Sequence, residues 1–210
     1  MMRFWLHLLF VLIWLSLLEH GETRRASFKP RPPQKPKPTE AEKAVQKLTP
    51  SQNIDINQMS GRWYLVSVMS RCKTLLEKGF KLESTTIDLE NNGNKLSVVT
   101  TTKLNFECWK ISQNYTITKT PGQFILKGKR SADDMDLIVF DTDYSSYAIL
   151  VFKRGKKITM KLYGRSGIVP DNAIDKFEDH AKIFGFGLDL LFQYPHYGFC
   201  ESEDKVLGMT

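Results

Sequence analysis

Eight short runs rich in apolar and β-branched residues follow one another between residues 62 and 165, and no long helical pattern interrupts them. Turn signals separate the runs, among them Asn91–Asn94 and Pro121–Gly122. Strands that recur at spacings of about 8–12 residues are typical of antiparallel sandwiches and barrels, in which neighbours in sequence pair in the sheet. The sequence therefore predicts an all-β antiparallel fold, with strands over 62–70, 84–90, 95–104, 108–118, 123–129, 135–142, 146–153 and 157–165.

One α-helix is predicted after the last of these strands. Residues 170–172, Pro-Asp-Asn, form a start signal, and Gly185 marks the end. Between them apolar residues recur at helical spacing, at Ile174, Phe177, Ala181 and Phe184. We expect this apolar stripe to lie against the outside of the barrel, with a short strand over Leu190–Gln193 after the helix.

Residues 1–21 are interpreted as a secretory signal peptide. Arg3 precedes an apolar run from Leu8 to Leu18. As a helix this run would rise about 16 Å, roughly half the thickness of the hydrocarbon core of a bilayer. The alternative is an anchoring helix that stays on the chain. No other apolar run is long enough to span a bilayer, so we expect a secreted protein with no direct membrane insertion.

Residues 22–52 are predicted to form a basic, proline-rich flexible arm ahead of a folded domain over 53–210. Residues 22–47 carry eight basic and three acidic residues, whereas residues from 48 on carry 21 basic and 19 acidic ones. The net charge of +7 is thus concentrated in the arm, which argues against a domain that binds nucleic acid. The alternatives for the arm are a solvated linker and a segment that docks on an acidic surface or an SH3-like groove.

Three marks occur along the predicted strands: Gly61-Arg62-Trp63, Thr142-Asp143-Tyr144 and Arg165. An indole at the closed end of a barrel needs a lid, and an arginine can stack on its face while its guanidinium bonds nearby carbonyls. Together these marks resemble the lipocalin family. The resemblance implies an eight-stranded antiparallel up-and-down barrel with one C-terminal α-helix over 53–210. It also implies structural roles for Gly61, Trp63, Thr142, Asp143, Tyr144 and Arg165.

The three cysteines are Cys72, Cys108 and Cys200, and an odd count in a secreted chain leaves one of them without a partner in the chain. Their positions alone allow three internal pairings. The resemblance implies an intrachain disulfide between Cys108 and Cys200 and an interchain disulfide from Cys72. Arg71 and Lys73 flank Cys72, and nearby cations stabilise a thiolate and favour exchange. The alternative for Cys72 is a capped or buried free thiol.

No catalytic or metal-binding motif is found in the sequence, which lacks HExxH, CxxC, GxSxG and a phosphate-binding glycine loop. His180 and His196 lie far from Cys72 in the order of strands, so a Cys–His nucleophile is not expected. The acidic residues at 133–136 lack the pattern of a calcium loop. We expect no metal, no cofactor and no enzymatic activity. The enzymatic alternatives are a thiol isomerase and a radical-scavenging reductase that act through Cys72.

The interior of the barrel is expected to form a cup that holds a small lipophilic ligand or a peptide loop of a partner chain. The alternative is an interior that its own side chains close. Alternation along the strands and the resemblance assign six residues to this cup: Trp63, Leu65, Ser67, Met69, Tyr147 and Ile149. Asn114 is the only residue in a glycosylation sequon and is the candidate site for a glycan.

Several runs narrow the resemblance within the lipocalin family, namely 61–72, 161–166 and 194–201. They imply a secreted, non-enzymatic accessory subunit of the terminal complement (membrane attack) complex. Its partner would be the alpha chain of complement component 8, bonded through Cys72, and through it the beta chain. The alternative is a free plasma lipocalin of the alpha-1-microglobulin type, which binds small apolar ligands and scavenges through a reactive Cys72.

Overall fold

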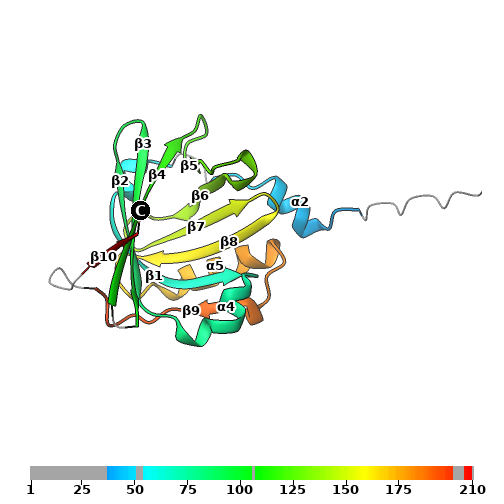
Figure 1. Ribbon diagram of the computed structural model, residues 1–210. Helices are drawn as coiled ribbons and strands as arrows, with labels where there is room; N and C mark the ends of the chain where they lie inside the picture. Colours follow the sequence, from blue (N-terminus) through cyan, green and yellow to red (C-terminus); the bar gives the residue numbers. More distant parts are fainter. Residues whose placement is uncertain (1–36, 51–53, 106, 201–205, 210) are drawn as a thin grey trace, which may run out of the picture. The chain divides into compact units, whose positions relative to one another are not determined.

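The computed structural model in Figure 1 describes residues 37–50, 54–105, 107–200 and 206–209. The chain divides into two units, Met1–Lys37 and Pro38–Thr210, and the second contains every strand and helix described below. The expected signal peptide and the arm up to residue 36 lie outside the described residues. Within the ranges that the structure describes, no helix is both long and apolar enough to cross a membrane.

Eight antiparallel strands form a closed barrel in the order in which they occur in the sequence. Each pairs with the next, and β8 returns to pair with β1. This confirms the predicted fold. Strand β5 is shorter than expected, and beyond its end the Gly128 amide donates to the Asp134 carboxylate. The strands are β1 Gly61–Ser70, β2 Thr85–Asn91, β3 Lys95–Leu104, β4 Glu107–Ile117, β5 Gln123–Leu126, β6 Met135–Thr142, β7 Tyr147–Arg154 and β8 Lys157–Gly164.

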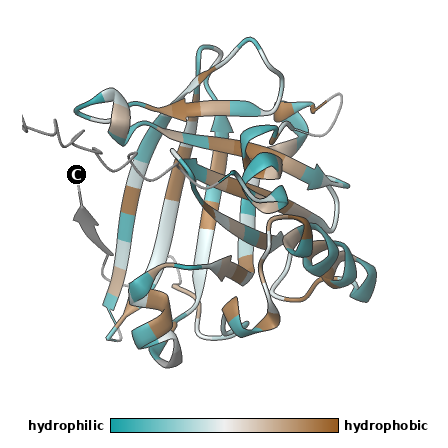
Figure 2. Ribbon diagram, turned by 90° about the vertical axis from the view of Figure 1, so that its right-hand side faces the viewer, coloured by the Kyte–Doolittle hydropathy of each residue, from teal (hydrophilic) through white to brown (hydrophobic). Residues whose placement is uncertain are grey.

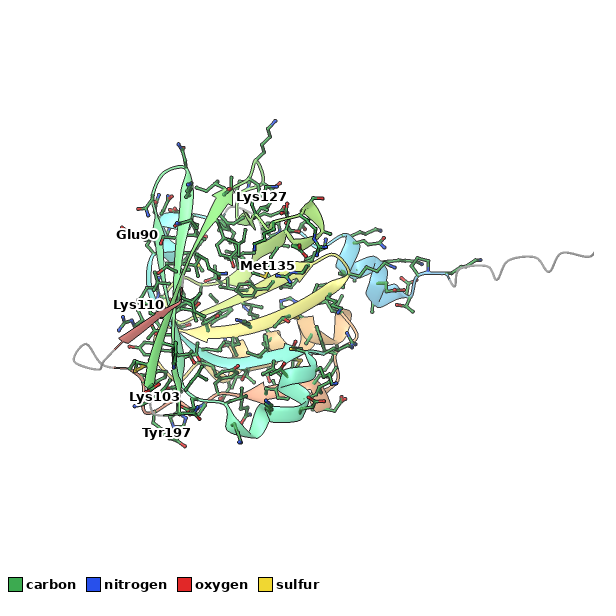
Figure 3. The ribbon with its side chains drawn as sticks, in the orientation of Figure 1. Glu90, Lys103, Lys110, Lys127, Met135 and Tyr197 are labelled. Carbon is green, nitrogen blue, oxygen red and sulfur yellow. A yellow bond between two sulfur atoms is a disulfide. The ribbon has the colours of Figure 1, made fainter. Side chains whose placement is uncertain are left out.

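Apolar side chains gather on both faces of the barrel wall, and Figure 2 shows hydrophobic and hydrophilic residues mixed along the strands. One buried cluster fills the interior and includes Trp63, Leu89, Tyr115 and Leu150. The other lies between the outside of the wall and the C-terminal helix. In Figure 3 side chains crowd the space enclosed by the strands. Wall residues are therefore apolar on both faces wherever the helix covers them.

Helix α5, Asp171–Ile183, packs against the outside of the barrel, as predicted. Its buried row is Ala173, Phe177 and Ala181, which recur every four residues. Ile174, which the sequence assigned to this stripe, is 37 % exposed. The prediction for Ile174 is therefore wrong, because the buried row of α5 runs through Ala173, one residue before Ile174.

Helix α2, Glu40–Gln46, occupies part of the segment that was expected to be an extended arm. A capping box starts it: Thr39 Oγ1 accepts from the Glu42 amide, and the Glu42 carboxylate accepts from the Thr39 amide. Val45 is buried in the outer cluster together with Ile158. The expectation of a flexible chain is therefore wrong for residues 40–46, since capping and one apolar anchor hold this turn against the barrel.

The remaining elements are short. Helix α3, Ile56–Met59, leads into β1, and α4, Lys73–Lys78, follows it. Strand β9, Leu191–Gln193, pairs with β1 close to its predicted place, and β10, Val206–Met209, runs parallel to β4. Three 3₁₀ turns, η1 Gly79–Lys81, η2 Ser131–Asp133 and η3 Leu188–Leu190, complete the described elements.

Candidate functional site

A buried indole and an arginine close one end of the barrel. Trp63 is 0 % exposed and its Nε1 donates a 2.7 Å hydrogen bond to the Met59 carbonyl. The guanidinium carbon of Arg165 lies 3.7 Å from the centroid of the Trp63 ring. Gly61 has φ +99°, and a Cβ there would lie 3.4 Å from Arg165 Nη1. Arg165 also donates to four carbonyls around the ring, those of Gln58, Ser60, Arg62 and Tyr144, at 2.7, 3.0, 3.3 and 2.9 Å.

The turn between β6 and β7 belongs to the same closed end. The Asp143 carboxylate accepts hydrogen bonds from the amides of residues 145–147. Thr142 Oγ1 accepts from the Tyr144 amide at 2.9 Å, and the Tyr144 hydroxyl accepts from the Asp55 amide at 3.0 Å. The turn thus fastens the segment before β1 to the end of β6, and its groups are engaged in structural bonds.

The cup residues predicted on β1 lie on opposite sides of the wall. Trp63 and Leu65 belong to the interior cluster. A bulge shifts the register of β1 between Leu65 and Ser67, so that Val68 joins the interior. Met69 lies in the outer cluster, and Ser67 pairs with Leu162 of that cluster. The placement of Ser67 and Met69 in the cup is therefore wrong, because one extra residue inverts the alternation beyond it.

The cup residues predicted on β7 are also outside. Tyr147 and Ile149 belong to the outer cluster, and Lys176 of α5 donates a 2.8 Å hydrogen bond to the Tyr147 hydroxyl. Ala148 and Leu150, the alternate residues, line the interior instead. Alternation shows which residues share a face, but for β7 the helix, which covers the other face, decides which face points inward.

The inward side chains near the open end of the cup are only partly buried. Trp109 and Ile111 share the inward face of β4 with the buried Tyr115, yet both are only partly buried. Phe152 continues the inward face of β7 toward the same end and is partly buried as well. The wall here is mainly aromatic and aliphatic, so its chemistry suits an apolar ligand.

One cation, Lys161, interrupts this apolar wall. Its register partners, Val68 and Leu150, are both interior residues, and its Nζ lies 4.5 Å from the centroid of the Phe152 ring. Burial lowers the pKa of Lys161 to about 8. Within the described part of the chain no carboxylate offsets this effect. The ammonium therefore stands in the cup with a ring face as its contact.

Cys72 is exposed at the opposite end of β1 from Trp63 and has no disulfide partner in the chain. It is the first residue before α4. The backbone amides of Leu75 and Thr74, with the charge of Lys157, lower the pKa of the Cys72 thiol against the smaller opposing effect of burial. A larger fraction of the thiol is therefore ionised near neutral pH than in an ordinary cysteine.

The structure joins Cys108 and Cys200, the two cysteines that the resemblance paired. Cys108 is buried on the outer face of β4, and Cys200 follows the tail that leaves β9. Phe199, next to Cys200, packs edge-on against Tyr64 with ring centroids 4.8 Å apart. The disulfide closes a separation of 92 residues and fastens the tail to the barrel wall.

The family of the chain follows from a match to the model of the lipocalin / cytosolic fatty-acid binding protein family, which covers residues 60–196. This chain is a lipocalin. A solved structure titled "The Siderocalin Ex-FABP functions through dual ligand specificities" shares the fold, with a TM-score of 0.59 and 23 % identity over 67 % of this chain and 96 % of that one.

Among curated proteins this lipocalin is 34 % identical over 169 residues to the complement component C8 gamma chain of Oryctolagus cuniculus, covering 80 % of this chain and 84 % of the relative. It is 30 % identical over 161 residues to protein AMBP of Bos taurus, covering 73 % of this chain and 46 % of the relative. The chain spans about half the length of the AMBP relatives that it matches.

Two features of this lipocalin escaped the sequence analysis: the cation in the cup and the packing of α2 beside Cys72. Lys161 alternates with Thr159 and Tyr163, but its burial depends on which face of β8 points inward. The predicted sequon residue Asn114 is exposed on β4. In Figure 3 Lys110 of the same strand lies on the outer side. Among the described residues, no group of three or more His, Cys, Asp or Glu side chains could hold a metal ion.

The buried ammonium makes a pH-dependent prediction. The pKa of Lys161 is lower in the folded than in the unfolded chain, so burial of the ammonium lowers the free energy of unfolding. This loss is largest below about pH 8, where Lys161 is charged in both states. The loss disappears as pH rises from about 8 toward 10. Lys161→Met should therefore be more stable than the wild type near pH 7, by roughly 1–2 kcal/mol after a discount for partial exposure.

Urea denaturation of both proteins across this pH range measures the effect. The difference in the free energy of unfolding between Lys161→Met and wild type should decrease as pH rises. The control, Lys110→Met on the outer face of β4, should show no such trend, since Lys110 is exposed. A gap for Lys161→Met that is constant between about pH 7 and 10 would contradict the burial of this ammonium.

Proposed function

We propose that this lipocalin is a secreted accessory subunit of the terminal complement complex, disulfide-linked through Cys72 to the alpha chain of component 8 and through that chain associated with the beta chain. The observation that carries the proposal is the exposed thiol of Cys72, left over while Cys108 and Cys200 are joined. The similarity to a complement C8 gamma chain over 80 % of this chain supports the same role.

The proposal includes a division of the chain into a signal peptide at 1–21, an arm from residue 22 and a lipocalin domain that extends to residue 210. The role is non-enzymatic, and the intrachain disulfide keeps the tail in place beside the barrel. Asn114, exposed on β4, is the proposed glycosylation site. The inward residues Trp63 and Leu65, with Val68 in place of the outward Ser67, line a cup for a small lipophilic ligand or a partner loop.

A second candidate function is that of a free plasma lipocalin that scavenges through Cys72. The lowered pKa of the Cys72 thiol and the 30 % identity to bovine protein AMBP favour it. The two roles differ in what the thiol meets: a cysteine held by a docked chain, or a small electrophile that diffuses in.

Recombinant alpha chain distinguishes the two. Cys72→Ser should abolish the disulfide-linked species on non-reducing gels, while surface plasmon resonance still detects binding with an affinity within about a few-fold of wild type, since a covalent link adds effective concentration to an existing interface. As a control, Cys72→Ser combined with Thr74→Cys keeps a thiol on the same exposed segment and should link far less. Absence of binding by wild type and variant alike would reject the subunit role.

A further inference from the structure

A groove of about 740 Å³ lies beside Cys72, outside the interior cluster. It is bounded by α2, by the end of β1 and by the turn between β7 and β8, which lie next to one another in Figure 1. Its apolar floor comes from Val45, Ile158 and Phe184, all buried. Cys72 and Lys73, the first residue of α4, form one side. The groove therefore offers space for a peptide segment directly against the reactive thiol.

Positive charge dominates the lining of this groove. Among the described residues that line it, Glu42 is the only acidic one, against five cations: Arg71, Lys73, Lys153, Lys156 and Lys157. Lys73 and Lys156 are partly neutralised, by Glu77 at 3.6 Å and Glu42 at 3.8 Å. Among the described residues Lys153 and Lys157 have no ion pair within 4.0 Å, and Lys157 is close enough to lower the pKa of Cys72.

We propose that this groove binds an acidic, cysteine-bearing segment of the partner chain and so presents its cysteine to Cys72. This inference rests on the proposed function and names the surface that would make the link selective. An exposed thiol has no selectivity of its own, whereas a cationic groove with an apolar floor favours acidic segments that also carry apolar side chains.

The charges argue against two other occupants. Residues 22–38, which precede α2, carry six basic residues and one acidic residue, and this net charge of +5 would be repelled by a cationic lining. A second copy would bring an identical set of five cations against the first. Like charges placed opposite each other cost free energy, so neither fits without compensating groups. An acidic segment from a different chain is attracted to the cations of the groove and is therefore the occupant that we propose.

The covalent step then follows as thiol–disulfide exchange. The Cys72 thiolate attacks the sulfur of the partner's cysteine, which is carried as a mixed disulfide with a small thiol of the glutathione class. The new S–S bond joins the two chains and the small thiol leaves as its thiolate, so no further oxidant is consumed. The nearby lysines stabilise the attacking thiolate and hold the acidic segment in place.

Two synthetic peptides test the charge preference without the partner. Each carries one cysteine activated as a mixed disulfide, flanked in one peptide by glutamates and in the other by lysines. At low ionic strength wild type should react roughly tenfold faster with the glutamate peptide. Lys153→Glu with Lys157→Glu should abolish or reverse that preference. The control pair Lys95→Glu and Lys119→Glu, exposed at the closed end, makes the same change in net charge and should keep it.

The rate of linking to the alpha chain of component 8 provides the second test. The Lys153→Glu/Lys157→Glu variant should link to it roughly tenfold more slowly than the control pair, and added salt should shrink the difference. Circular dichroism and urea melts of both variants establish that they fold. Three results would each overturn the proposal. They are equal reaction rates of wild type with the two peptides, linking of the Lys153→Glu/Lys157→Glu variant to alpha chain at the rate of the control pair, and binding of wild type only to phosphatidylserine vesicles. Failure of wild type to bind alpha chain by any route, with the peptide preference intact, would instead reject the proposed function and this partner.

Discussion

Replacing Trp63 with alanine is expected to lower the free energy of unfolding by about 3–5 kcal/mol. The indole is fully buried, its Nε1 bonds the Met59 carbonyl, and Arg165 covers its face at 3.7 Å. Alanine leaves a cavity under the guanidinium and removes both the stack and the hydrogen bond. Urea denaturation followed by circular dichroism measures the loss.

Trp109→Ala is the matched control, since the same side chain is removed from a partly exposed position in the open half of the cup. It should lower the free energy of unfolding by no more than about 1–2 kcal/mol, because the side chain of Trp109 buries less apolar area than that of Trp63. If Trp63→Ala costs no more than Trp109→Ala, the indole does not support the closed end of the barrel and the account of that end is wrong.

Removing the internal disulfide should have an effect of similar size. Cys200→Ser is expected to destabilise the protein by roughly 2–5 kcal/mol, because the Cys108–Cys200 disulfide closes a separation of 92 residues and limits the unfolded chain. The tail after β9 should also become more accessible to proteases, since the packing of Phe199 on Tyr64 depends on the tail staying in place.

Denaturation of wild type with and without reductant provides the comparison, and peptide mapping of the unreduced protein should recover Cys108 joined to Cys200. Cys72→Ser serves as the control and should leave the unfolding midpoint unchanged, because Cys72 is exposed and forms no internal disulfide. A mapped disulfide between Cys72 and either other cysteine would contradict both the internal disulfide and the free thiol on which the proposed function rests.

The strands and the closed end could be predicted because their signals are local. Apolar runs and turn residues give β1 to β8 nearly in place, and helix α5 begins within a residue of its start signal. The stack of Arg165 on Trp63 follows from the chemistry of a buried indole, which needs a cover wherever it lies. These features depend on residue type and spacing and little on long-range geometry.

The lining of the cup could not be predicted in the same way. The bulge between Leu65 and Ser67 adds one residue to β1 and inverts every assignment after it, and no turn residue announces it. For β7 both faces are apolar because α5 covers the outer one, so alternation does not distinguish Tyr147 from Ala148. The groove likewise depends on α2, which lies about a hundred residues from the β7–β8 turn in sequence.

Non-reducing electrophoresis of the native protein from plasma tests directly whether this lipocalin is a disulfide-linked subunit. We expect one larger species that reacts with antibodies to both this chain and the alpha chain of component 8. On reduction it should release this chain as a separate species, and its cross-linked peptide should contain Cys72. A protein that migrates only as a free monomer without reductant, with a Cys72 thiol that is free or capped by a small molecule, would contradict the subunit role and favour the scavenger.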